Sequence, residues 1–86
     1  MTFSVIVYSK PNCPYCVRAK KLLETRNINY TEKVVGVNTT REELLEAAPN
    51  ARTVPQIIIN NDVIGGYEQL VSYMEETNFN GTGYSL

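Results

Sequence analysis

The stretch Lys10-Pro11-Asn12-Cys13-Pro14-Tyr15-Cys16 contains both cysteines of the chain, in the spacing Cys-x-x-Cys. An apolar run at residues 3–8 precedes it and predicts a buried strand, and a helical pattern follows it. We therefore expect Cys13 at the N-cap of a helix and Pro14 at its first position, where a missing N–H costs nothing. The unpaired N–H groups and the positive dipole end of such a helix start favour a thiolate at Cys13.

Cys16 follows one turn later and shares a helix face with Cys13. It can reach a sulfur bonded to Cys13, but it should be the less exposed thiol. We therefore predict a redox pair in which Cys13 attacks and Cys16 resolves. Two alternatives are weaker. Zinc needs four ligands, and the chain has no histidine and no third cysteine, so we expect no metal site. A structural disulfide that closes so short a loop constrains the unfolded chain little.

Length and composition restrict the class of protein. With 86 residues and 43% hydrophobic content, the chain is expected to form one small domain with one core. No apolar stretch is long enough to span a membrane, and a net charge of −1 argues against general nucleic-acid binding. Residues 1–4 lack the basic start of a signal peptide, so we expect a cytoplasmic protein. In that reducing compartment a Cys-x-x-Cys pair is expected to be catalytic.

The charges are unevenly distributed. Seven of the eight basic residues fall in the first half of the chain, several of them on the helix that follows the cysteines. They are either a solvated helix face or a positive field that favours the Cys13 thiolate and attracts anionic thiols.

The hydrophobic pattern predicts seven elements. Strands are expected at residues 3–8, 29–35, 57–59 and 63–64, and helices at residues 14–26, 40–48 and 67–77. The order predicts an α/β fold: a four-stranded mixed sheet with helices on both faces. Its first two strands should be parallel and right-handedly connected, and its third strand should be antiparallel to the first. We assign residues 1–77 to the domain and 78–86 to a flexible or loosely docked tail.

Three motifs, in this order and spacing, resemble the glutaredoxin family. They are Tyr8-Ser9-Lys10-Pro11-Asn12-Cys13-Pro14-Tyr15-Cys16, Thr53-Val54-Pro55-Gln56 and Ile64-Gly65-Gly66-Tyr67. The match covers about residues 3–76, and Cys-Pro-Tyr-Cys resembles the dithiol class. The resemblance implies a thioredoxin-like fold, β1-α1-β2-α2-β3-β4-α3, and a cis-Pro55 beside the dithiol. The alternative for Pro55 is an ordinary trans-proline at a strand start.

The resemblance also implies that glutathione is the co-substrate and that no cofactor is tightly bound. Lys10 would pair with the glycine carboxylate of glutathione, and Tyr15 would pack on its cysteinyl portion. The segment Thr53-Val54 would pair with the glutathione backbone by strand addition, and Gln56 would contact the glycine end. From its spacing alone, Arg52 is predicted to add to the attraction of anions.

The other end of the predicted glutathione site departs from the family pattern. Gly65 and Gly66 allow close approach, and free N–H groups at the helix start near Tyr67 would hold the γ-glutamyl carboxylate. The aspartate that commonly ends this stretch in the family is Gln69 here. Either Glu68 supplies the acid from the neighbouring position, or Gln69 binds without charge and affinity falls.

The function that this resemblance implies is that of a glutathione-dependent thiol–disulfide oxidoreductase. It would reduce protein disulfides and protein–glutathione mixed disulfides, and we expect it to act as a monomer. Ribonucleotide reductase is one candidate protein substrate, although no residue selects it. One alternative is a thioredoxin-like reductase recharged by a flavoenzyme. Another is a dimer holding a glutathione-ligated iron–sulfur cluster of the 2Fe–2S type through Cys13, which Pro14 disfavours by family analogy.

Overall fold

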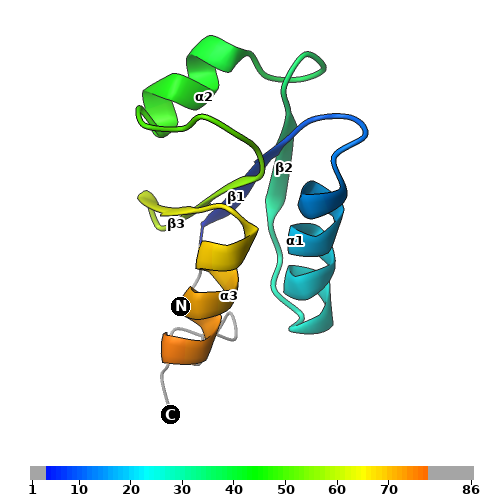
Figure 1. Cartoon of the computed structure of the whole chain (residues 1–86), viewed down its shortest axis with the longest axis vertical. Helices are drawn as coiled ribbons and strands as arrows, with labels where there is room; N and C mark the ends of the chain where they lie inside the picture. The colour runs from blue at the N-terminus through cyan, green and yellow to red at the C-terminus, as the bar shows by residue number, and fades with distance from the viewer. Residues whose placement is uncertain (1–3, 78–86) are drawn as a thin grey trace.

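The structure, a computed structural model, describes residues 4–77 of the chain. Its elements are β1 (Val5–Ser9), α1 (Pro14–Thr25), β2 (Thr31–Val34), α2 (Arg41–Ala47), β3 (Gln56–Ile59), β4 (Asp62–Gly65) and α3 (Tyr67–Thr77) (Figure 1). The predicted order of strands and helices is confirmed. The predicted tail, residues 78–86, lies outside the described residues, so its assignment stays a prediction. No helix within residues 4–77 combines the length and apolarity needed to cross a membrane.

The largest difference from the predicted boundaries is at β2, which is shorter than the strand expected at residues 29–35. The Val34 carbonyl accepts backbone N–H groups from Val37 at 3.0 Å and Asn38 at 3.1 Å. The Asn38 side chain in turn accepts from the Val34 N–H at 2.6 Å. The C-terminal end of the strand therefore lies at Val34, because a turn uses the hydrogen-bonding groups of that residue.

The four strands form one mixed sheet in the order β2-β1-β3-β4. β1 pairs with β2 in parallel and with β3 antiparallel, and β3 pairs with β4 antiparallel. The apolar first strand is therefore central, as its composition predicts. The β3–β4 loop is the two-residue segment Asn60-Asn61, with φ of 51° and 70°. Two positive φ angles match the turn that best suits the twist of a hairpin, and asparagine tolerates them.

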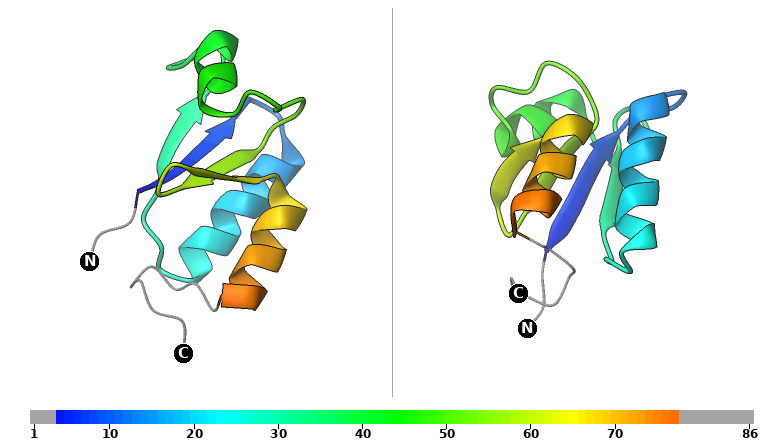
Figure 2. Two further views of the ribbon diagram at one scale, coloured as in Figure 1. Left: turned by 90° about the vertical axis from the view of Figure 1, so that its left-hand side faces the viewer. Right: turned by 60° about the horizontal axis from the view of Figure 1, so that its bottom comes forward.

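Helices cover both faces of the sheet, which confirms the predicted architecture (Figure 2). α1 and α3 pack on one face through Leu23 and Met74, which meet buried side chains of β1 and β3. α2 packs on the other face, where Leu44 contacts a cluster that includes Tyr8 and Ile58. This arrangement places the start of α1, the loop before β3 and the start of α3 at one end of the sheet (Figure 1).

Candidate active site

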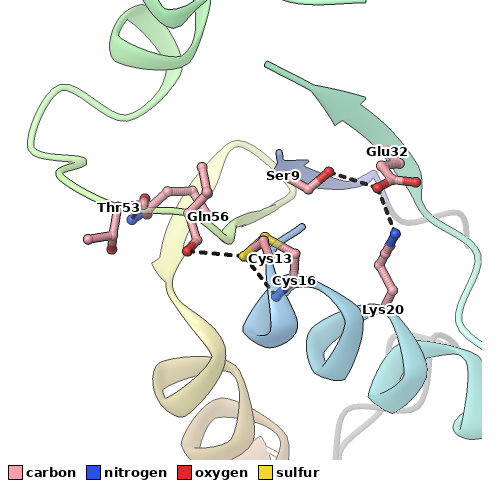
Figure 3. The surroundings of a disulfide bond; sticks show 8 residues. Ser9, Cys13, Cys16, Lys20, Glu32, Thr53 and Gln56 are labelled. Carbon is pink, nitrogen blue, oxygen red and sulfur yellow. Dashed lines mark hydrogen bonds and ion pairs between the residues drawn. A yellow bond between two sulfur atoms is a disulfide. The ribbon is translucent and has the colours of Figure 1, made fainter. Parts of the chain in front are cut away.

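The two cysteines lie at the start of α1 and are joined by a disulfide (Figure 3). Cys13 is the N-cap of the helix and Pro14 follows it, as predicted. The Cys16 backbone N–H points at the Cys13 sulfur over 3.2 Å. Cys13 is 8% exposed and Cys16 only 1%. The predicted order of exposure is therefore confirmed, and a thiol that reacts with an outside partner has its better access at Cys13.

The loop before β3 reaches the dithiol directly. The Val54–Pro55 peptide bond is cis, as the sequence resemblance predicts. The Val54 carbonyl oxygen lies 3.7 Å from the Cys13 sulfur. Gln56 is buried, and its amide nitrogen donates to the Thr53 carbonyl at 2.9 Å. Gln56 thus stabilises this loop through a hydrogen bond to its backbone. The sequence predicted only a contact of Gln56 with glutathione.

Two adjoining pockets surround the loop. We call the first, of about 350 Å³, the proline groove; its lining residues are Tyr15, Thr53, Val54, Pro55, Gly66, Tyr67, Glu68 and Gln69. The second, of about 430 Å³, shares Thr53, Gly66 and Gln69 with the groove and adds Arg52, Gln56 and Gly65. The structure thus brings together all the residues predicted to contact glutathione except Lys10. That residue lines a third pocket, on the β2 side of the dithiol.

The aromatic wall of the proline groove is formed by Tyr15 and Tyr67. Their ring centroids are 6.2 Å apart, and the rings are tilted by 38°. The Arg18 guanidinium carbon lies 5.3 Å from the centroid of the Tyr15 ring, within the range of a cation–π contact. Sequence reasoning counted Arg18 only among the basic residues of this helix and did not predict its contact with Tyr15. The signal it missed was the spacing of three residues between Tyr15 and Arg18 on one helix.

The start of α3 is closed by a side chain of the helix itself. The Gln69 side-chain oxygen accepts the Gly66 N–H at 3.0 Å. The same side chain packs on Gly65, where an added Cβ would lie 3.0 Å from the Gln69 Cγ and where φ is +119°. The expectation of free N–H groups at this helix start is therefore wrong for Gly66, because Gln69 occupies it. Glu68 is exposed beside this contact.

A charged cluster that sequence reasoning missed lies on the other side of the dithiol (Figure 3). The Glu32 carboxylate oxygen Oε2 accepts from the Ser9 hydroxyl at 2.7 Å and from the Lys20 ammonium at 2.8 Å. The Lys20 hydrogen bond, followed by that of Ser9, lowers the pKa of Glu32. Lys20 follows Cys16 by four residues on α1, a spacing visible in the sequence, but its partner on β2 is not. Within residues 4–77, no group of three or more His, Cys, Asp or Glu side chains is placed to hold a metal ion.

Comparison with known proteins gives a consistent result. The Glutaredoxin family model matches residues 5–64. Glutaredoxin 1 of Rickettsia conorii is 40% identical over 76 residues, which cover 85% of this chain and 74% of that protein. Glutaredoxin 3 of Escherichia coli is 37% identical over 67 residues, covering 78% and 81%. The crystal structure of a buckwheat glutaredoxin–glutathione complex aligns with a TM-score of 0.74 at 27% identity, covering 86% and 70%.

The family-model match extends over the dithiol, the cis-proline loop and most of the sheet. The fold is the thioredoxin-like fold of these structural neighbours. A cysteine pair at the start of α1 in this context supports thiol–disulfide exchange. The chain belongs to the glutaredoxin family of thiol–disulfide oxidoreductases.

Proposed function

We propose that this chain is a glutathione-dependent oxidoreductase that reduces protein disulfides and protein–glutathione mixed disulfides. One observation carries the proposal. The Cys13 sulfur is at once the N-cap of α1, 3.2 Å from the Cys16 nitrogen, and 3.7 Å from the Val54 carbonyl. The more accessible of the two sulfurs therefore lies where a thiolate is stabilised and where a peptide-like substrate could pair with the backbone of Val54.

In the first step, the Cys13 thiolate attacks the glutathione sulfur of a mixed disulfide. A Cys13–glutathione disulfide forms, the bond between glutathione and the target protein breaks, and the target leaves as a thiolate that takes a proton from water. The Cys16 N–H and the α1 dipole stabilise the attacking Cys13 anion. Cys13 is the predicted nucleophile because Cys16 is almost completely buried.

The enzyme then returns to the dithiol state by one of two routes. A second glutathione thiolate attacks the bound glutathione sulfur, which releases oxidised glutathione and the Cys13 thiolate. When the substrate is a protein disulfide, Cys13 first attacks one of its sulfurs, and a Cys13–protein mixed disulfide forms as the protein disulfide breaks. The Cys16 thiolate then attacks the Cys13 sulfur and releases the reduced protein. That second route produces the Cys13–Cys16 disulfide found in the structure, which glutathione then reduces.

The proline groove is the proposed site for glutathione. Its peptide-like backbone would pair with Val54, its cysteinyl portion would pack on Tyr15, and its γ-glutamyl end would reach the start of α3 near Glu68. The pocket that holds Arg52, Gln56 and Gly65 adjoins this groove. The buckwheat relative whose crystal structure contains glutathione supports this choice of ligand.

The proposal extends to the setting in which the protein acts. We infer that it works as a cytoplasmic monomer, and that its partners are disulfide-containing or glutathionylated proteins. Ribonucleotide reductase is one candidate among them. No nucleic acid and no membrane takes part in the proposed reaction.

The test is glutathione-dependent reduction of a small mixed disulfide, coupled to glutathione reductase. We expect Cys13→Ser to be inactive and Cys16→Ser to keep activity on mixed disulfides while losing it on protein disulfides. A wild-type protein that is inactive with glutathione but recharged by thioredoxin reductase would replace the proposal with the thioredoxin-like alternative. Iron–sulfur absorbance in anaerobically purified protein would instead favour the cluster-holding dimer.

A further inference from the structure

The pocket on the β2 side of the dithiol differs in character from the proline groove. It has a volume of about 590 Å³, and we call it the lysine pocket. Both cysteines contribute to its wall, together with Lys10, Lys20 and Glu32. Cys16 does not line the proline groove, whose residues come from the first turn of α1, the loop before β3 and α3. The charged groups that share a pocket with Cys16 are therefore those of the lysine pocket.

Lys20 is held in this pocket by hydrogen bonds that connect it through Glu32 to Ser9. It follows Cys16 by four residues, so the two side chains are neighbours on one face of α1. Its ammonium bonds Glu32 Oε2 at 2.8 Å, and the same oxygen accepts the Ser9 hydroxyl at 2.7 Å. The Lys20 and Glu32 side chains are 26% and 31% exposed, and Ser9 is buried. Charges that are partly shielded in this way are screened less by solvent and salt than free surface charges.

Reduction of the Cys13–Cys16 disulfide places a negative charge in this environment. An outside thiolate attacks the Cys13 sulfur, a new Cys13–thiol disulfide forms, and the Cys13–Cys16 bond breaks. The electron pair remains on the Cys16 sulfur, which is left as a thiolate. Cys16 is only 1% exposed, so water stabilises this thiolate poorly. A leaving thiolate that is better stabilised leaves faster.

We propose that Lys20 stabilises the Cys16 thiolate as it leaves, and that Glu32 and Ser9 are positioning residues that hold the Lys20 ammonium in the lysine pocket. Glu32 has two opposing effects, because it orients Lys20 and also offsets part of its positive field. Lys20 thereby sets both the rate at which the disulfide is reduced and the potential of the couple. The proposal rests on the thiol–disulfide chemistry of the family and not on glutathione as the reductant.

The cluster permits variants with opposite expected effects. Lys20→Met removes the positive charge and keeps much of the apolar stem. Glu32→Gln removes the opposing negative charge, and its amide oxygen still accepts hydrogen bonds from Ser9 and Lys20. If the cluster only tied α1 to β2, both changes would weaken the same contact and act in the same direction. An electrostatic role predicts opposite directions.

The experiment measures reduction of the oxidised protein by dithiothreitol at pH 7, with alkylation by a maleimide-polyethylene glycol as the readout. We expect the rate to fall about threefold in Lys20→Met and to rise about threefold in Glu32→Gln. The midpoint potential in a dithiothreitol redox buffer should move by about 14 mV for a threefold change in the equilibrium constant. A tenfold change corresponds to about 30 mV for a two-electron couple. The potential should become more reducing in Lys20→Met and more oxidising in Glu32→Gln.

Two further variants separate charge from structure. Lys21→Met removes the same charge from the neighbouring, exposed position of α1, which does not line the lysine pocket, and should leave the rate and potential unchanged. Lys20→Arg keeps the charge and should stay within twofold of wild type. The proposal is overturned if Lys20→Met and Glu32→Gln shift in the same direction, or if Lys21→Met matches Lys20→Met. If Lys20→Met does not fold, the sign of the Glu32→Gln shift still decides. Failure of glutathione as a substrate would not affect this dithiothreitol measurement.

Discussion

The Gln69 side-chain oxygen accepts a hydrogen bond from the Gly66 backbone N–H over 3.0 Å, at the start of α3. Gly66 precedes the first residue of this helix, so the contact supplies a partner for one of the donors that a helix start leaves unpaired. In the family pattern that the sequence resembles, an aspartate commonly stands where this chain has Gln69. The same contact therefore caps α3 without adding a charge to the end of the proline groove.

We expect Gln69→Asp to lower the KM for glutathione by up to about tenfold. A charge-assisted hydrogen bond contributes about 1.5–3 kcal/mol, compared with about 0.5–1.5 kcal/mol for a neutral one, and a carboxylate here would meet the γ-glutamyl ammonium. Steady-state kinetics with glutathione provide the measurement. Cysteinylglycine, which lacks the γ-glutamyl group, is the matched substrate, and its KM should not change. An equal improvement for both thiols would contradict the assignment of this end of the groove.

The two cysteines should differ in reactivity once the disulfide is reduced. At pH 7, limiting iodoacetamide should modify Cys13 at least about tenfold faster than Cys16, because Cys13 is the N-cap sulfur and the more accessible of the two. Peptide mass mapping after brief alkylation measures the ratio. A Cys13→Ser variant is the control and should react slowly throughout. Equal labelling of the two sulfurs would show that the helix start does not select the nucleophile.

The side chain of Leu23 is predicted to contribute strongly to stability. It is fully buried between α1, the sheet and α3. Truncation of a buried leucine removes apolar contacts and leaves a cavity, so Leu23→Ala should lower the free energy of unfolding by about 2–5 kcal/mol. Urea denaturation followed by circular dichroism measures the change. Leu22→Ala is the matched control. The Leu22 side chain is only half-buried, so this variant should lose less than half as much unfolding free energy. Similar losses would mean that α1 packs in a different rotation.

Tyr30 should give the fold a pH dependence at high pH. Burial, followed by the hydrogen bond that its hydroxyl donates to Glu24, raises the pKa of Tyr30 to about 12. The unfolded chain titrates near 10. The folded state therefore holds the proton more tightly, so this contribution is complete below about pH 10 and is lost as the pH rises through about 12.

Unfolding free energies of wild type and Tyr30→Phe, measured between pH 8 and 12, test this effect. The difference between the two proteins should shrink as the pH rises above 10. Glu24→Gln keeps a hydrogen-bond acceptor and removes the charge. The pH dependence of its unfolding free energy should therefore lie between those of wild type and Tyr30→Phe. A difference that stays constant across this range would exclude a role for the Tyr30 proton.

Much of the site could be predicted because it depends on contacts close in sequence. Cys13 and Cys16 are three residues apart on one helix, so the helical repeat alone places both sulfurs on one face. The cap of α2 is equally local, because the Thr40 hydroxyl oxygen accepts the N–H of Glu43, three residues along the chain, at 3.1 Å. The positions of Val54 and Pro55 beside Cys13 came from resemblance to a family, because no local rule connects residues so far apart in sequence.

The sequence by itself determined the redox pair, its place at a helix start and the order of the strands and helices. Only the tertiary structure decided which side chains surround that pair. It placed Lys10 in the lysine pocket rather than the proline groove, and it joined Lys20 on α1 to Glu32 on β2. It also turned Gln56 inward and folded Gln69 back onto Gly66. Periodicity fixes the direction of a side chain on its own element, whereas the partner across an interface depends on how the elements pack together.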